Sequence, residues 1–330
     1  MKKVLAIILV LLTLFTTASC GMDRKTSLKY ACTSDEFFYP EMHIDKGYDI
    51  DTLEPDEQFT KIFNKICSQE VIFINSAYNL NFTVEDIPVY VLDFDDLTLN
   101  INQGAAPVAF YEQALNVVLI NSKYTKNDTY VYAVLTHEAF HYIFKYNNKD
   151  TKFGLELDST HFLGTSLTEG FTNILAIQFL AVTNNYAAGT VVGSAYYLET
   201  SIVEMLESIP DLYYLYLTNN VAAISEIFNS RIWQYTTVDP LNKITPFEYF
   251  LFQMESFCNM NSYHAMQPTV EKYATYNYEF GYATFEMLFA IARDSSDVTK
   301  DELVSVYDST FEVWNISEEN PRSNFMSSIK

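Results

Sequence analysis

The stretch "VLTHEAFHYIF", residues 134–144, places His137 and His141 four residues apart, with Glu138 next to the first histidine. It belongs to a longer segment, residues 128–148, that contains neither proline nor glycine, starts with an aspartate as the expected N-cap and stops at two asparagines. This pattern predicts a helix. Because residues four apart lie on the same face of a helix, both imidazoles point toward one place. The helix is apolar on nearly every side, so we expect it to be buried at the centre of the fold.

Two histidines and a glutamate at this spacing form the H-E-x-x-H pattern of zinc enzymes. Imidazole nitrogens bind zinc at about 2.0 to 2.1 Å, and a catalytic zinc has three protein ligands and one open position. His137 and His141 are the first two predicted ligands. Glu138 lies one position further round the helix, where its carboxylate can act as the general base toward a metal-activated water. The alternative is that both histidines are core residues of an aromatic-rich helix.

The third ligand is expected in "LTEGFTN", residues 167–173, near the start of the next predicted helix. Glu169 is the best candidate in this stretch, because a ligand on a rigid element holds its geometry better than a ligand on a loop. Ser166 and Glu169 also fit a capping box, in which the glutamate would bond to the backbone of the cap instead. His161 and Asp158 are the other candidates, on the preceding loop.

The flanking segments predict an α+β fold. A helix is expected at residues 57–80, because its apolar residues recur at helical spacing. Runs of β-branched and aromatic residues at 87–95 and 106–121 predict strands, the second of them a hairpin that turns near Gln113. From about residue 194 onward the pattern is mostly helical. We therefore expect a small mixed β-sheet beside the histidine helix, followed by a mainly helical part.

The domain organisation begins with a signal sequence at residues 1–19, which has two lysines, an apolar run shorter than the about 20 residues that span a bilayer, and then small residues. Its ending, "TASC", resembles a bacterial lipobox, which implies cleavage before Cys20 and attachment of lipid to this cysteine. The acidic residues 20–57 are expected to form a tether, residues 58–165 an N-terminal subdomain and residues 166–330 a helical subdomain. The protein is thus predicted to be secreted across the cytoplasmic membrane and lipid-anchored at the cell surface or envelope.

The composition argues against a nucleic-acid partner, since the net charge of −22 repels phosphate backbones. With 49% hydrophobic and 16% aromatic residues the chain is globular, and we expect a monomer. Apart from Cys20, the cysteines are far apart in the sequence, so the chain has no cysteine-based zinc motif.

The pair "HEAFH" and "LTEGFTN" resembles the gluzincin metallopeptidases, the group that includes thermolysin and the zinc aminopeptidases. The resemblance implies a zincin-like fold with one zinc ion per chain on His137, His141 and Glu169. It implies Glu138 as the general base. It also implies that the strand before the histidine helix, residues 116–121, pairs with an extended substrate by β-addition.

Two departures from the family concern the surroundings of the site. Thermolysin-like members have an aspartate that orients a zinc histidine where this chain has Asn173, whose amide oxygen can still accept the imidazole N–H. The Gly-x-Met-Glu-Asn segment of the zinc aminopeptidases is replaced by "GAAPV" from Gly104, so we expect an endopeptidase or an enzyme of very restricted specificity. The family also uses a tyrosine or a histidine to stabilise the oxyanion. Tyr196 and Tyr197 are the candidates here, and we assign Tyr197.

The expected activity is hydrolysis of peptide bonds in protein or peptide substrates by an extracytoplasmic zinc metallopeptidase. The alternative is a surface lipoprotein that binds a peptide or a glycan and has a structural or degenerate zinc site. Amide bonds in cell-wall or mucin-like material are a third target for the same site. A side chain in the fourth zinc position, or the lack of a cleft beside it, would favour the binding protein.

Overall fold

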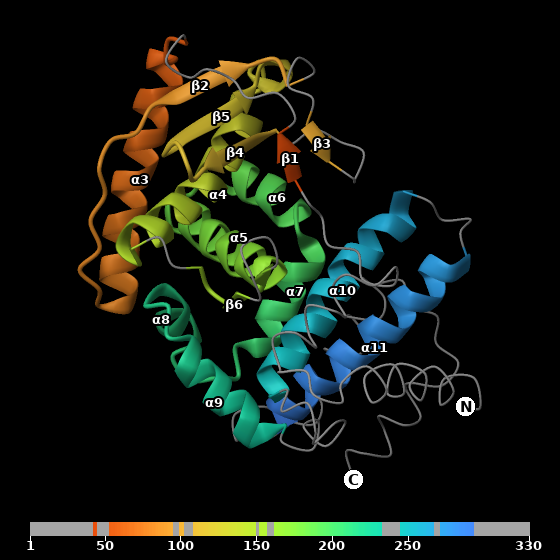
Figure 1. Cartoon of the computed structure of the whole chain (residues 1–330). Coiled ribbons are helices and arrows are strands. Elements are labelled where there is room, and N and C mark those ends of the chain that lie inside the picture. Colours follow the sequence, from red (N-terminus) through yellow and green to blue (C-terminus); the bar gives the residue numbers. More distant parts are fainter. Residues whose placement is uncertain are drawn as a thin grey trace.

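The computed structural model describes most of the chain between residues 53 and 293 and one short segment before it. The described residues are 42–44, 53–94, 99–101, 108–149, 152–156, 162–232, 245–266 and 271–293. The signal sequence, Cys20 and most of the expected tether lie outside them, so what the sequence indicates there stays a prediction. The described chain is mostly helical with a small mixed sheet, which is compatible with the α+β class (Figure 1).

The sheet has three strands, β2 (Val89–Leu92), β4 (Ala109–Glu112) and β5 (Val117–Asn121), in the order β2–β5–β4. β5 pairs parallel with β2 and antiparallel with β4. The turn of the β4–β5 hairpin spans residues 113–116, as predicted. Because β5 has a neighbour on each side, it has no open edge, and the prediction that residues 116–121 pair with a substrate is wrong. Within the described sheet, the edge strands are β2 and β4.

The other elements are helices and short strands. The helices are α3 (Glu57–Tyr78), a 3-10 turn η2 (Ser122–Tyr124), α4 (Asp128–Asn147), α5 (Thr165–Val182), α6 (Tyr186–Ser194), α7 (Tyr197–Leu206), α8 (Leu212–Leu217), α9 (Val221–Arg231), α10 (Pro246–Met266) and α11 (Glu271–Arg293). The short strands pair antiparallel as β1 (Met42–Ile44) with β3 (Leu99–Ile101) and β6 (Leu155–Glu156) with β7 (Phe162–Leu163).

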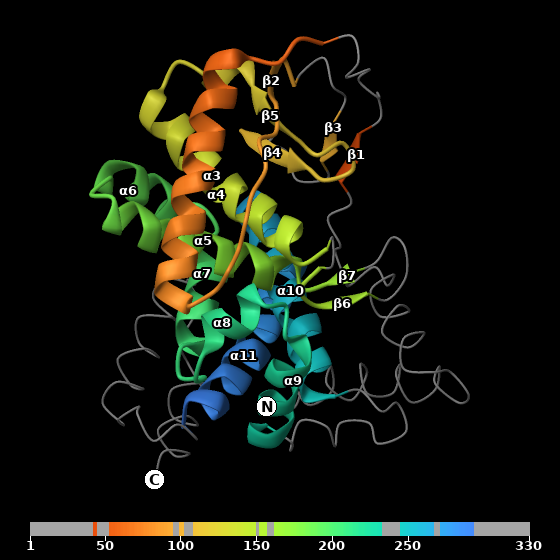
Figure 2. The ribbon, with the colours of Figure 1, turned by 90° about the vertical axis from the view of Figure 1, so that its left-hand side faces the viewer.

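Helix α3 confirms the first predicted helix. The Asp56 carboxylate caps it by accepting hydrogen bonds from the amides of Gln58 and Phe59. The helix ends at Asn79, whose left-handed conformation (φ 53°) is one that asparagine tolerates. α3 packs against α4 and against β2, and Figure 2 shows it running from the sheet along the helical part.

The histidine helix is α4, and it is the central helix of the fold. Its N-cap is Asn127 and not Asp128 as predicted, because the Asn127 side chain accepts a hydrogen bond from the amide of Tyr130. α4 contacts α3, α5, α6 and strand β4. Neighbours on these sides bury most of its residues from Val131 to Phe144, which confirms the central position expected from its apolar surface.

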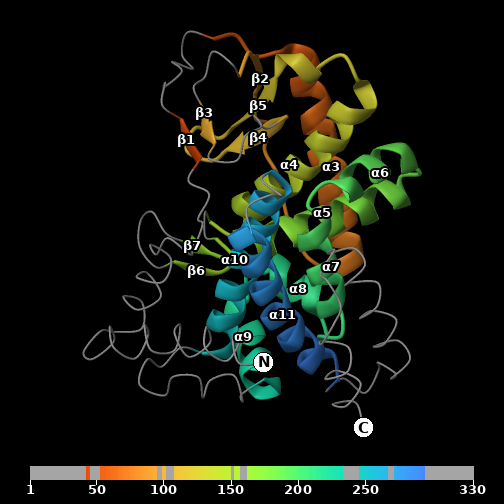
Figure 3. The same ribbon diagram turned by 90° about the vertical axis from the view of Figure 1, so that its right-hand side faces the viewer.

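One cluster of buried apolar side chains extends from Phe63 in α3 to Ala292 in α11. Packing is therefore continuous across the predicted subdomain boundary at residue 165, where α5 begins, and the division into two subdomains stays a prediction. Among the described residues beyond this point the mainly helical character is confirmed, and Figure 3 shows α10 and α11 side by side. In the described segments, no helix combines the length and the apolar character needed to cross a membrane.

Candidate metal centre

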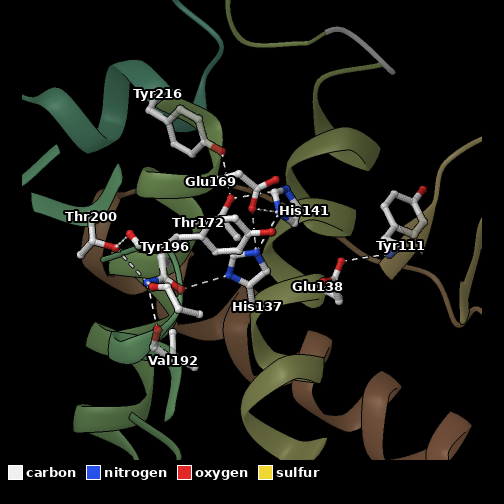
Figure 4. A network of polar contacts seen from close by, with 12 residues as sticks. Tyr111, His137, Glu138, His141, Glu169, Thr172, Val192, Tyr196, Thr200 and Tyr216 are labelled. Atoms are coloured by element: carbon white, nitrogen blue, oxygen red, sulfur yellow. Dashed lines mark hydrogen bonds and ion pairs between the residues drawn. The ribbon is translucent and has the colours of Figure 1, made fainter. Parts of the chain in front are cut away.

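Three side chains from α4 and α5 converge on one point (Figure 4). His137 and His141 lie one turn apart on α4, and their Nε2 atoms are 3.1 Å from each other. Glu169, in the second turn of α5, places Oε2 3.0 Å from Nε2 of His137 and 3.3 Å from Nε2 of His141. Packing of α5 against α4 therefore brings the predicted ligands together.

The hydrogen-bond partners of His137 show which of its nitrogens faces this point with a lone pair. Nδ1 lies 3.3 Å from Oδ1 of Asn173. The amide oxygen is on this side because the Asn173 nitrogen faces three other acceptor oxygens. In the neutral imidazole Nδ1 therefore carries the proton, and Nε2 presents a lone pair to the Glu169 carboxylate. Two such acceptors repel each other unless a proton or a cation lies between them.

The geometry of the group fits a metal ion. Three ligand atoms bound to one tetrahedral zinc at about 2.0 to 2.1 Å would lie about 3.4 Å from each other. The three separations here, 3.1, 3.0 and 3.3 Å, are slightly shorter than this. Two imidazoles and one carboxylate are also a ligand set that catalytic zinc sites use. The buried group of His137, His141 and Glu169 can therefore hold a metal ion.

Glu169 points toward the histidines and not back to the start of α5. Burial would raise the pKa of its carboxyl, but Coulombic attraction by His141, and the hydrogen bonds that both imidazoles donate when their Nε2 atoms carry a proton, lower this pKa well below its usual range. The capping box with Ser166 is therefore wrong, and the N-cap residue, Gly164, has no side chain to cap the helix. Instead, Glu255 of α10 accepts hydrogen bonds from the amides of Ser166 (3.1 Å) and Gly164 (3.4 Å). A carboxylate from a distant helix thus caps α5, and Glu169 remains available to the cluster.

His141 has a neighbour on α5 that the sequence did not indicate. Oγ1 of Thr172 lies 3.5 Å from Nδ1 of His141 and 3.4 Å from the hydroxyl oxygen of Tyr216 in α8. The Tyr216 ring stacks on Phe171 with 4.2 Å between the ring centroids. Thr172 follows Glu169 by three residues, so the sequence could have predicted that it lies on the same helix face. The sequence could not have predicted Tyr216, because its position depends on the packing of α8.

Glu138 lies beside the cluster and is not one of the three converging groups. Its Oε2 accepts a hydrogen bond of 2.9 Å from the backbone amide of Tyr111 in β4. Burial raises the pKa of the Glu138 carboxyl to about 7; the charge of Glu169 adds to this rise, whereas His137 and the Tyr111 amide oppose it. A carboxyl group with this pKa can accept and release a proton near neutral pH.

Tyr196, and not Tyr197, lies at the cluster. The Tyr196 ring stacks on His137, with 5.3 Å between the ring centroids and 12° between the planes. Chiefly through the negative charge of Glu169, the pKa of Tyr196 is raised well above its usual range, so the hydroxyl keeps its proton. The hydroxyl of Tyr197 instead accepts a hydrogen bond from Asn261 of α10. The assignment of Tyr197 to the site therefore has no support in the geometry.

A cavity of about 330 Å³ opens beside the cluster. Its polar side chains are those of Tyr130, His137, Glu138, Asn173, Ser194 and Tyr196. Its apolar side chains come from β4 and the residue before it, α4, α6 and the α6–α7 connection: Val108, Ala109, Ala133, Val134, Val191, Val192 and Ala195. Of the described residues, no lysine or arginine lines it. The volume is at the lower end of ligand pockets, which suits a single side chain or a short segment of a substrate.

No family model, curated protein or solved structure matches this chain. Of the predicted site residues, the structure brings together His137, His141, Glu169, Glu138 and Asn173. The alternative third ligands, residues 158 and 161, lie outside the described part of the chain.

Proposed function

We propose that this protein is an extracytoplasmic zinc metallopeptidase with a zincin-like fold, which hydrolyses internal peptide bonds of protein or peptide substrates. The observation that carries the proposal is the convergence of His137, His141 and Glu169 next to a cavity that Glu138 also lines. Structural zinc sites are closed by four protein ligands, whereas catalytic sites keep one position open. Three ligand groups, of which His137 lines an accessible cavity together with Glu138, support a catalytic site. The lipobox-like ending at Cys20 supports lipid anchoring at the cell surface.

Each side chain of the cluster has a defined part in this proposal. His137 and His141 bind the metal through Nε2, and Glu169 binds it through Oε2. When bound, zinc supplies a Lewis acid that polarises a peptide carbonyl group and acidifies water. Glu138, held at Oε2 by the Tyr111 amide, accepts the proton of the attacking water and passes it to the leaving amine.

Tyr196 is the residue that we now assign to the oxyanion in place of Tyr197. Its hydroxyl keeps a proton to donate, and its ring lines the cavity against His137. A donor fixed beside the reacting carbonyl stabilises the negative charge that develops on its oxygen.

The edge of the sheet supports an extended substrate on β4 instead of β5. The amide of Asn121 donates to the carbonyl of Val108, so the alternation of antiparallel pairs turns the backbone groups of Ala109 and Tyr111 away from β5. The Tyr111 amide binds Glu138, which places this edge beside the general base, so a substrate strand would pair with the backbone groups of Ala109. We propose that a peptide lies along β4 by strand addition. The cavity would then take an uncharged, apolar side chain next to the cleaved bond.

The test compares wild type with Glu138→Gln on a diverse peptide library, with zinc measured in the same samples. Because the glutamine keeps the size of the side chain but cannot take up the proton, cleavage should fall by about 100- to 10,000-fold while one zinc per chain is retained. Glu226→Gln, an exposed glutamate of α9, makes the same chemical change away from the site and should leave both unchanged. A wild-type protein without zinc at neutral pH would overturn the proposal. Zinc binding without cleavage of any peptide would favour the binding lipoprotein.

A further inference from the structure

We propose that Asn173 is a positioning residue that acts through both ends of its side-chain amide. Its oxygen orients the metal ligand His137, and its nitrogen holds the segment 192–200, which carries Tyr196 and one wall of the cavity. This position therefore requires an amide and not the carboxylate that thermolysin-like peptidases have there. The inference deepens the proposed function and rests on it for the role of the site.

The contacts of the amide nitrogen are the first evidence. Asn173 is fully buried. Its Nδ2 donates toward the carbonyl oxygens of Val192, at 3.0 Å, and Ala195, at 2.8 Å, and toward Oγ1 of Thr200, at 2.9 Å. The Thr200 hydroxyl uses its own proton in a 2.7 Å bond to the carbonyl of Tyr196, so it acts as an acceptor toward Asn173. Two amide protons thus serve three acceptors from α6, the α6–α7 connection and α7.

The segment that these bonds hold needs an external support. Tyr196 has φ 47° and ψ 37°, a left-handed conformation that a tyrosine rarely adopts, and it immediately precedes α7. Residues in such conformations persist where the surrounding structure fixes them, and they are frequent at functional sites. Here, the bonds of Asn173 to Ala195 and Thr200 fix the chain on both sides of Tyr196. They thereby fix the place of its ring against His137.

The packing of α7 on α5 makes these bonds possible. A Cβ atom at position 170 would overlap the backbone carbonyl of Glu199, so only glycine lets the two helices approach this closely. This approach brings Thr200, the next residue, within reach of Asn173. Gly170 therefore permits the hydrogen bond between Asn173 and Thr200.

A carboxylate could not take the place of this amide. An aspartate at this position would put an oxygen without a proton against two carbonyl oxygens and a hydroxyl whose proton is already used, in a buried site where no solvent can compensate. If Asn173 only oriented His137, an aspartate would be the better residue at this position, because a carboxylate partner raises the basicity of a ligand histidine.

The test uses Asn173→Asp, with Asn184→Asp as its control. Asn184 is exposed beyond the other end of α5, so the control makes the same charge change away from the contact. We expect Asn173→Asp to raise amide hydrogen exchange in residues 192–200 at least about tenfold and to lower kcat/KM about 10- to 100-fold, as changes around metal ligands do. The control should change neither. Unaltered exchange together with equal or tighter zinc binding in Asn173→Asp would overturn the inference.

Thr200→Val provides a second test if Asn173→Asp does not fold. This variant removes one acceptor of the amide nitrogen but leaves the contact of Asn173 with His137 intact. It should increase exchange in residues 192–200 and lower kcat/KM, while the zinc dissociation constant stays within about twofold of wild type; Thr200→Ser, which keeps the hydroxyl, should restore both properties. Thr200→Val without an effect on exchange would contradict the inference. If exchange responds as expected but wild type cleaves no peptide, the proposed function fails and the positioning role of Asn173 stands.

Discussion

Replacing Glu169 by glutamine tests the residue for which two readings of the sequence compete most directly. As a metal ligand, Glu169 contributes a charged oxygen, which lies 3.0 and 3.3 Å from the two histidine nitrogens. Changes in residues around metal ligands already cost about 10- to 100-fold in affinity, so loss of a ligand charge should weaken zinc binding by at least about 100-fold. This factor corresponds to about 2.7 kcal/mol.

The assay is competition for zinc against a chelator at neutral pH, with thermal unfolding of the metal-free protein measured in parallel. A residue that only capped α5 would behave differently, because its loss would cost about 1 kcal/mol of stability and leave zinc affinity unchanged. Glu226→Gln is the control for the change of charge. A Glu169→Gln protein that binds zinc within about threefold of wild type, yet is less stable by about 1 kcal/mol, would refute the ligand role and restore the capping box.

Two further predictions concern a buried carboxyl group and the cavity. Glu70 of α3 is fully buried, and neither carboxylate oxygen has a hydrogen-bond partner among the described residues. Burial raises its pKa well above the usual value, so the folded protein keeps a proton on Glu70 that the unfolded chain loses above its pKa of about 4.3. The free energy of unfolding is therefore highest below this pH and falls as the pH rises. Glu70→Met should therefore raise the free energy of unfolding by about 1 to 3 kcal/mol at neutral pH and flatten its pH dependence, as measured by urea unfolding at several pH values; a less stable variant at neutral pH would contradict this. Val191→Phe should narrow the cavity and lower kcat/KM for peptides with a large apolar side chain at the cleaved bond more than for peptides with alanine there. An equal loss for both kinds of peptide would show that the cavity does not select the substrate.

Local patterns predicted the helices that matter most for the site. Helix α4 follows from a run without proline or glycine, and the facing of His137 and His141 follows from their spacing alone. The β4–β5 hairpin also follows from its strand-forming residues and the turn between them. These features depend on hydrogen bonds and side-chain contacts between residues close in the chain, so a single sequence contains the necessary information.

The neighbours of the site were harder to predict, because they depend on contacts between distant segments. β5 was expected to pair with a substrate, but pairing with β2 and β4 takes both of its edges. Tyr196 and Tyr197 are adjacent and chemically identical. The left-handed conformation at Tyr196 turns its ring to His137, whereas the Tyr197 side chain reaches α10. Hydrogen bonds to α5 hold this conformation, and the sequence does not reveal them.

The sequence by itself determined that two imidazoles and a glutamate share one turn of a buried helix, because the period of an α-helix is a property of the local backbone. Only the tertiary structure decided what Glu169 does. Its carboxylate was equally suited to cap its own helix, and the choice depends on Glu255, which reaches the first amides of α5 from α10. Once a carboxylate from elsewhere satisfies those amides, Glu169 gains more by facing two imidazoles that hold its charge.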